Sequence, residues 1–145
     1  MRELTLILPF PPSVNNYKTI GKIVKTKTGK LYQERRNSNE TKMFYYECYL
    51  RCKRFMPSEQ SGSLYGGDKQ LGVAITLQPP LKTSYTRWDL DNRLKVLLDA
   101  LMYCRIIEDD SQIHRLVVEK GAMIEQGQSI VTIKEFLQCP IAQST

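Results

Sequence analysis

The pattern of hydrophobic and polar positions changes along this chain between a period of two, typical of strands, and a spacing of three and four, typical of helices. Strands are predicted over residues 4–8, 20–24, 31–32, 71–77, 113–120 and 129–136. Residues 25–30 then form the positively charged tip of a β-hairpin, although a flexible loop would fit the same composition. Residues 56–69 are expected to be a mobile loop, and residues 139–145 a flexible tail.

Two helices are predicted between these strands. The first spans residues 39–55, which contain no Gly or Pro, and Ser38 or Asn37 is expected to cap its start. Its apolar positions are Met43, Tyr46, Cys48, Leu50 and Phe55. The second helix spans residues 89–105, and its apolar face is predicted to carry Leu94, Leu97, Leu98 and Leu101. The predicted fold is therefore α+β, a mixed β-sheet packed with two main helices in a single domain, residues 1–145.

The composition favours a cytoplasmic globular protein. No apolar run approaches the roughly 20 residues that span a bilayer, so no membrane partner is expected. Prolines interrupt the only early apolar segment after Leu8, and a signal peptide is not expected either. The cysteines at positions 48, 52, 104 and 139 are expected to be free thiols. A zinc site that includes Cys48 and Cys52 is the less favoured alternative, because His114 is the only histidine.

The net charge of +6 is unevenly distributed along the chain. Residues 18–54 hold eleven Lys or Arg and three Glu, a balance of +8, whereas residues 55–145 have a balance of −2. Such a concentration of positive charge is typical of a nucleic-acid surface, and we expect Lys25, Lys27 and Lys30 at the hairpin tip to contact DNA. The alternative is a solvated face without a partner.

Acidic residues gather at two places in the other part of the chain. Asp89 and Asp91 stand at the start of the second helix, and Asp109 and Asp110 come just before a predicted strand. Helix capping alone would explain an acid at the first place. If the chain reverses after Ile107, however, one acid of the second cluster returns to the helix start. Three carboxylates there would repel one another unless a cation neutralised them, which predicts a Mg²⁺ site.

Two neighbours of these acids have alternative explanations. Lys95 follows Asp91 by four residues and so shares its helix face, where its ammonium would reach a phosphate held by the metal. The reaction class that follows is phosphodiester hydrolysis, in which the metal activates water and Lys95 stabilises the charged transition state. An ordinary salt bridge is the alternative for Lys95. Trp88, beside Asp89, either stacks on a DNA base or belongs to the core.

Three stretches of this sequence resemble the RusA family of Holliday junction resolvases, which are small magnesium-dependent endonucleases. Residues 8–17, LPFPPSVNNY, are similar to the family's LPxPPSxNxxY start. Residues 89–101, DLDNRLKVLLDAL, match its DLDNxxKxxxDAL helix, and residues 108–113, EDDSQI, match its DDxxI/V entry to a strand. The order and spacing of the three stretches agree with the family, whereas residues 20–70 contain no recognisable motif.

The resemblance implies roles for individual residues. Asp89, Asp91 and Asp110 would be the catalytic, metal-binding acids, with Asp109 the weaker choice in its pair, and Lys95 would be the essential lysine. It also implies Mg²⁺ as the cofactor, for which Mn²⁺ can substitute. A homodimer would present two such sites to one branched DNA molecule.

One departure from the family concerns the residues before the first acid. Family members often have a basic run there, whereas this chain offers only Arg87 and then Trp88. We expect Arg87 and Asn92, on either side of Asp89, to contact DNA.

The predicted function is that of a Mg²⁺-dependent endonuclease of phage or prophage origin, which resolves four-way (Holliday) junctions by paired symmetric nicks in recombination or DNA processing. Two alternatives stay open: a metal nuclease of the same fold that acts on other branched DNA, and a basic DNA-binding protein without activity.

Overall fold

The computed structural model describes residues 3–13, 18–81 and 88–136. Its centre is a four-stranded sheet with the strand order β1-β6-β4-β5. The strands are β1 (Glu3–Leu8), β4 (Leu71–Gln78), β5 (Ile113–Lys120) and β6 (Gln128–Glu135). β6 pairs antiparallel with both β1 and β4, whereas β4 and β5 are parallel. The sheet is therefore mixed, and each of its strands lies within one or two residues of its predicted position.

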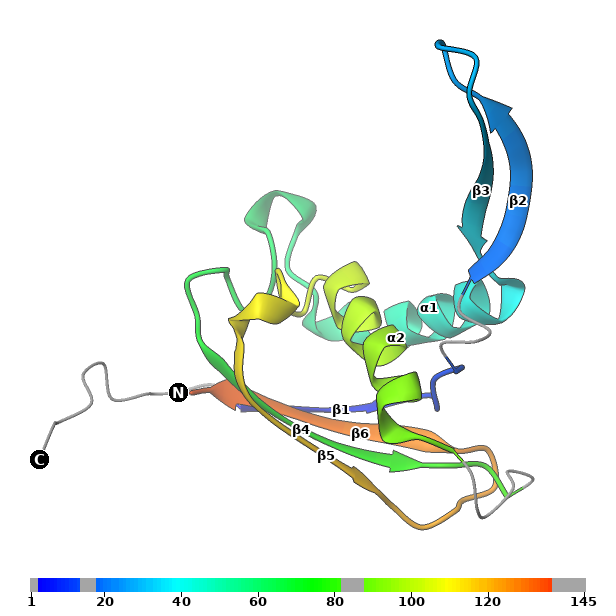
Figure 1. The fold of residues 1–145 in the computed structure, drawn as a ribbon. Helices are drawn as coiled ribbons and strands as arrows, with labels where there is room; N and C mark the ends of the chain where they lie inside the picture. Colours follow the sequence, from blue (N-terminus) through cyan, green and yellow to red (C-terminus); the bar gives the residue numbers. More distant parts are fainter. Residues whose placement is uncertain (1–2, 14–17, 82–87, 137–145) are drawn as a thin grey trace, which may run out of the picture.

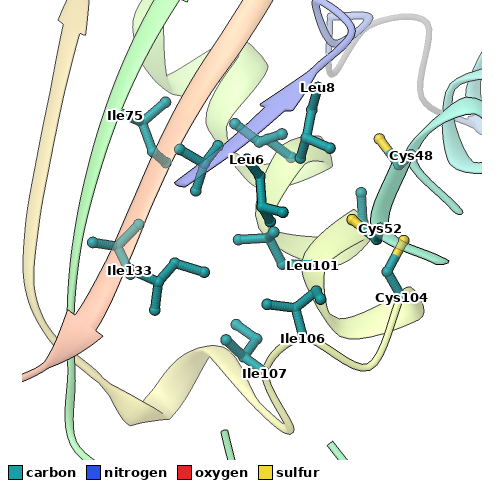
Figure 2. Packing of buried hydrophobic residues seen from close by; sticks show 14 of the residues in the cluster. Leu6, Leu8, Cys48, Cys52, Ile75, Leu101, Cys104, Ile106, Ile107 and Ile133 are labelled. Atoms are coloured by element: carbon teal, nitrogen blue, oxygen red, sulfur yellow. The ribbon is translucent and has the colours of Figure 1, made fainter. Parts of the chain in front are cut away.

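Two helices, α1 (Asn39–Cys52) and α2 (Leu90–Tyr103), pack on one face of this sheet, and no described helix covers the other face (Figure 1). The predicted α+β class is confirmed. Figure 2 shows the core between the layers, where Leu6 and Ile133 of the sheet approach Leu101 of α2. Neither helix is long and apolar enough to cross a membrane, a finding that covers the described part of the chain. The predicted flexible tail, 139–145, lies outside the described residues.

The predicted hairpin is confirmed as a two-stranded sheet of its own, formed by β2 (Lys18–Lys25) and β3 (Leu31–Asn37). Figure 1 shows it standing away from the body of the protein, above one end of α1. Its tip is a defined turn, in which the Thr26 amide donates to the Lys30 carbonyl at 2.8 Å. Gly29 has φ +86°, a conformation that glycine adopts without strain. The flexible-loop alternative is therefore not what the structure shows.

Helix α1 begins at the predicted cap, because the Ser38 hydroxyl accepts a hydrogen bond from the Thr41 amide at 3.2 Å. Of its five predicted apolar positions, Cys48 is buried and Phe55 packs against the core, whereas the other three are exposed. The residues that face the core are Thr41, Phe44, Cys48 and Cys52, and those that stay exposed include Met43, Tyr46 and Leu50. Thr41 takes a core position because its hydroxyl is satisfied locally by the Ser38 hydroxyl at 3.0 Å.

The three described cysteines are free and buried, as predicted. Cys48 and Cys52 of α1 and Cys104 after α2 meet at the junction of the two helices (Figure 2). Burial raises the pKa of Cys48, and a hydrogen bond with Cys52 together with burial raises that of Cys104. The same hydrogen bond lowers the pKa of Cys52. Cys48 and Cys104 therefore stay protonated, and all three residues pack in the core as small side chains. Cys139 lies outside the described residues.

The segment 56–69 is joined to the body at several points. The Leu64 and Tyr65 amides donate to the carbonyls of Arg105 and Ile106, at 2.8 and 3.0 Å. The Arg105 guanidinium in turn donates to the carbonyls of Pro57, Ser58 and Gly62. Arg105 is the one non-glycine residue with positive φ, +54°, in the described ranges. Its side chain holds a backbone conformation that L-residues disfavour, and the mobility predicted for the segment remains a prediction.

Two substitutions of Arg105 separate the side-chain contacts from the backbone strain. Arg105→Ala loses the guanidinium contacts and keeps the strained backbone, so we expect a loss of about 1–2 kcal/mol in the free energy of unfolding. Arg105→Gly loses the same contacts but relieves the strain, so we expect it to be about 1 kcal/mol more stable than the alanine variant. Urea denaturation measures both values. Equal stability of the two variants would contradict the strain, and an alanine variant as stable as wild type would contradict the anchoring role.

Candidate functional site

Asp89 and Asp91 lie where the sequence places them, at the start of α2. Asp89 is the N-cap residue, with φ −99° and ψ 138°, but its side chain accepts no capping hydrogen bond from the helix backbone. Instead its Oδ2 accepts a hydrogen bond from Nδ2 of Asn92 at 3.0 Å. Both acids are exposed, and Asp91 lies in the first turn. Capping, the structural explanation for Asp89, is therefore not the role that its carboxylate has here.

The residue before Asp89 fixes the start of the helix. Trp88 is buried, and its ring meets that of Phe10 edge-on, with 5.4 Å between centroids and an interplanar angle of 83°. Nζ of Lys120, at the end of β5, lies 4.7 Å from the centroid of the Trp88 ring. The base-stacking alternative for Trp88 is thus not supported. Trp88 belongs to the core, and it connects the proline-rich loop, α2 and β5.

Arg93 is a second anchor of the helix start that the sequence analysis missed. Its Nη1 donates to the Pro11 carbonyl at 2.8 Å, and its guanidinium carbon lies 5.0 Å from the centroid of the Phe10 ring. Burial lowers the pKa of Arg93, while the nearby charge of Glu40 acts in the opposite sense. A hollow of about 400 Å³ opens beside it, between the proline-rich loop and α1. The only sequence feature that could have indicated this role is the position of Arg93 directly after the DLDN motif.

Lys95 is exposed and lies on the face of α2 that also carries Asp91. Its Nζ approaches Oδ2 of Asp99 at 3.7 Å, so the salt bridge that the structure shows is with the next acid along the helix. The lysine of this pair is exposed, whereas the Asp99 side chain is only 16% exposed, and an i,i+4 helix pair contributes about 0.3–0.5 kcal/mol to stability. The pair is weak enough for Lys95 to exchange Asp99 for another anion.

The second acidic cluster divides into one engaged and one available carboxylate. Oδ2 of Asp109 accepts a hydrogen bond from the Ser111 amide at 3.1 Å. Hydrogen bonds from the side chain and then the backbone of Ser111 lower the pKa of Asp109. Asp110 is exposed, and no hydrogen bond or ion pair to another described residue engages its carboxylate. The geometry therefore favours Asp110 over Asp109 as a ligand.

Gln112 holds this cluster in place and was not predicted to have a role. It is buried, and its Oε1 accepts from the amides of Glu108 and Asp109 at 2.7 and 3.0 Å. Its Nε2 donates to the Gly66 carbonyl at 2.6 Å. A buried amide with both ends satisfied rigidifies the backbone on either side of it. Gln112 therefore fixes Asp110 relative to the segment that contains Gly66.

The two acidic clusters lie at opposite ends of the sheet. Asp110 precedes the first residue of β5, whereas Asp89 adjoins Trp88, which contacts Lys120 at the last residue of β5. Seven steps of an extended strand span about 23 Å. In Figure 1 the short 3-10 helix Asp110–Gln112, in yellow, and the start of α2, in light green, lie towards opposite ends of the sheet.

This separation corrects one expectation. The turn after Ile107 was predicted to return an acid of the second cluster to the start of α2, and within one chain it does not. Among the side chains in the described ranges, no group of three or more His, Cys, Asp or Glu is arranged to hold a metal ion. The reason is that β5 runs parallel to β4 and therefore begins at the far end of the sheet.

The residues predicted to contact DNA occupy different places. Lys25, Lys27 and Lys30 are exposed at the tip of the β2–β3 hairpin. Asn92 lies in the first turn of α2, where it orients the carboxylate of Asp89. Arg87 lies outside the described residues. The positive hairpin and the exposed acids are thus carried by separate parts of the fold.

The comparison with protein families agrees with this geometry. The family model described as endodeoxyribonuclease RusA matches residues 9–134, a range that contains the hairpin, both helices and both acidic clusters. None of the curated proteins matches this chain. Proteins of this family are divalent-metal-dependent nucleases that act on branched DNA. Because the match covers most of its length, the chain belongs to the RusA endodeoxyribonuclease family.

Proposed function

We propose that this protein is a Mg²⁺-dependent endonuclease that resolves four-way DNA junctions by paired, symmetric nicks in phage or prophage DNA processing. Membership of the RusA family supports the reaction class. The observation that supports specific catalytic residues lies at the start of α2. Asp89 occupies the capping position, yet its carboxylate bonds to the Asn92 side chain instead of the helix backbone, and it stays exposed beside Asp91.

These two carboxylates fit a hard divalent cation. Mg²⁺ binds in proteins through one or two carboxylates and completes its coordination with water and substrate phosphate. Asp89 and Asp91 supply two oxygen-donor side chains within one helical turn, and the positive end of the helix dipole lies beneath them. When bound there, the cation supplies a Lewis acid for the phosphate oxygens. Mn²⁺, which prefers similar ligands, can replace it.

The remaining groups act on the phosphate directly. Asn92 keeps the carboxylate of Asp89 oriented, and Lys95 leaves its weak pair with Asp99 to place an ammonium beside the negative charge that develops on the phosphate. Arg87 would add a second positive group before Asp89. In this arrangement the helix contributes the acids, the lysine and their common orientation.

Asp110 enters the same site from a second copy of the chain. Within one chain, Asp110 lies before the start of β5 and Asp89 lies near its end, and a strand of this length spans about 23 Å, which no rotamer change bridges. In a two-fold dimer, the Asp110 cluster of each copy is placed against the start of α2 of the other, so each site takes Asp89 and Asp91 from one chain and Asp110 of the partner subunit. Two such sites are related by the same two-fold axis that relates the arms of a four-way junction.

Two other functions make different predictions for the same DNA. A metal nuclease of this fold that prefers another branched structure would cut forks or flaps faster than four-way junctions. A DNA-binding protein without activity would bind all of them and cut none. The exposed acids at the start of α2 favour a nuclease, because acids without a metal repel phosphate and weaken binding.

The function is tested with labelled four-way, forked and linear DNA of the same sequence. With Mg²⁺ we expect paired nicks on the four-way junction that ligase can seal, and at least about tenfold slower cutting of linear duplex, a difference of about 1.4 kcal/mol between transition states. With chelator we expect no cutting. Faster cutting of the fork would favour the second nuclease function, and binding without product under all conditions would favour the DNA-binding protein.

The individual acids are tested with matched substitutions. Asp89→Asn, Asp91→Asn and Asp110→Asn should each slow cleavage by at least about hundredfold, since a direct ligand matters more than the outer groups whose loss costs about 10–100-fold. Junction binding should be unchanged or slightly tighter, because repulsion of the phosphate is removed. Asp109→Asn is the control, since asparagine can still accept the hydrogen bond from Ser111. If Asp109→Asn were as inactive as Asp110→Asn, our assignment within this pair would be wrong.

A site shared between two chains can be tested with mixed dimers. When Asp91→Asn and Asp110→Asn chains are co-expressed, half of the dimers are mixed, and each mixed dimer keeps one site with all its acids. We expect about a quarter of the wild-type number of sites and single nicks instead of paired ones. Asp89→Asn mixed with Asp91→Asn should stay inactive, because both changes affect the same half of the site. Inactivity of the first mixture would place the whole site within one chain.

A further inference from the structure

The β2–β3 hairpin carries two large apolar side chains that nothing in the described structure covers. Ile23 and Leu31 are each 70% exposed, the highest value among the large hydrophobic residues that are described. In the hairpin register, Lys25 pairs with Leu31, and Ile23 lies two residues before Lys25. Because side chains alternate between the faces of a strand, these three residues share one face. Ile23 and Leu31 are therefore diagonal neighbours, with Lys25 beside them.

The position of this pair argues against a role in the core. The hairpin stands away from the body (Figure 1). Lys25 and Leu31 form the last pair before its turn, so the apolar pair lies close to the tip. A two-stranded hairpin is only marginally stable in water. Isolated exposed apolar side chains are common on protein surfaces, whereas two that are neighbours on one hairpin face form a candidate contact for a partner.

The charge around the pair identifies the chemistry of that partner. Lys25 pairs directly with Leu31, Lys27 and Lys30 lie in the adjoining turn, and residues 18–33 contain no Asp or Glu. A partner that fits this surface has negative charges for the lysines and flat apolar faces for Ile23 and Leu31. Nucleic acid has both properties, since its phosphates flank stacked bases.

We propose that Ile23 and Leu31 form a wedge that enters the branch point of a four-way junction and separates base pairs there, while the three lysines hold the flanking phosphates. The proposal rests on the proposed function and assigns its preference for branched DNA to this hairpin. Isoleucine and leucine are among the side chains that other proteins insert between base steps. Separation of bases costs least where stacking is already interrupted, as it is at a branch point.

The wedge and the lysines have different effects on binding. Lysine contacts with phosphate strengthen binding to any DNA and make it depend on salt. The wedge strengthens binding only where bases can be separated at low cost, and linear duplex offers no such place. Loss of the wedge should therefore reduce selectivity, whereas loss of the lysines should reduce affinity for both kinds of DNA.

The experiment uses a four-way junction with 2-aminopurine next to the branch point and chelator to prevent cutting. Wild-type protein should raise the 2-aminopurine fluorescence, which reports loss of stacking. Ile23→Ser with Leu31→Ser should abolish the rise and weaken junction binding about five- to tenfold, with less than about twofold effect on linear duplex. Val117→Ser, an exposed apolar position on β5, is the matched control and should behave as wild type.

Further variants distinguish the effect of the wedge on DNA binding from the effects of lost charge and of misfolding. Lys25→Ala with Lys27→Ala and Lys30→Ala should weaken binding to both DNAs and flatten the slope of log K against log salt by up to ~0.9 per lost contact. The serine pair should leave that slope unchanged. The conservative pair Ile23→Leu with Leu31→Met should retain the fluorescence rise, which shows that apolar size at these positions is sufficient.

Several outcomes would overturn the wedge. The 2-aminopurine fluorescence could still rise with the serine pair, fail to rise with the conservative pair, or fail to rise with wild-type protein that binds tightly. Each of these outcomes leaves the nuclease function intact. Dissociation of a dimer by the serine pair in sedimentation would make the hairpin face a contact between protein chains. Wild-type protein that neither binds nor cuts the junction would overturn the proposed function, and the wedge with it.

Discussion

The parallel pairing of β4 with β5 is the constraint on which the rest of this structure depends. Parallel neighbours cannot be joined by a tight turn, so the chain crosses back over the sheet through α2. The helix therefore begins at the end of β4 and finishes near the start of β5. Asp89 and Asp110 stand at the two ends of this crossover, and the same hydrogen bonds that hold the sheet together keep them apart.

Each end of the crossover is fixed by residues that carry no negative charge. At the start of α2, Trp88 lies between Phe10 and Lys120, and Arg93 binds the proline-rich loop. At the other end, the amide of Gln112 joins the acidic turn to the segment before β4. Exposed acids on such supports keep their geometry without the help of a ligand, which is the condition for preorganised electrostatics. The acids themselves contribute little to the stability of the fold.

The sequence alone determined the elements and the location of the charge. Alternation of apolar residues predicted the strands, and the absence of Gly and Pro from residue 39 to residue 55 predicted α1 together with its Ser38 cap. The lysines of residues 25–30 could be placed at a hairpin tip because turn residues and flanking strands are local signals. Asp89 and Asp91 could be placed at a helix start for the same reason. All of these follow from interactions between residues close together in the chain.

Tertiary structure alone decided which faces and partners these elements use. The buried face of α1 contains Thr41, although Met43 is more apolar, because packing against the sheet selects the face and the Ser38 hydroxyl satisfies the threonine. Trp88 could be assigned to the core only from its contacts with Phe10 and Lys120, both distant in the sequence. The distance between the acidic clusters could not be predicted either, because no local sequence pattern indicates whether β4 and β5 pair in parallel. Contacts between distant residues decide such features, and no local pattern encodes them.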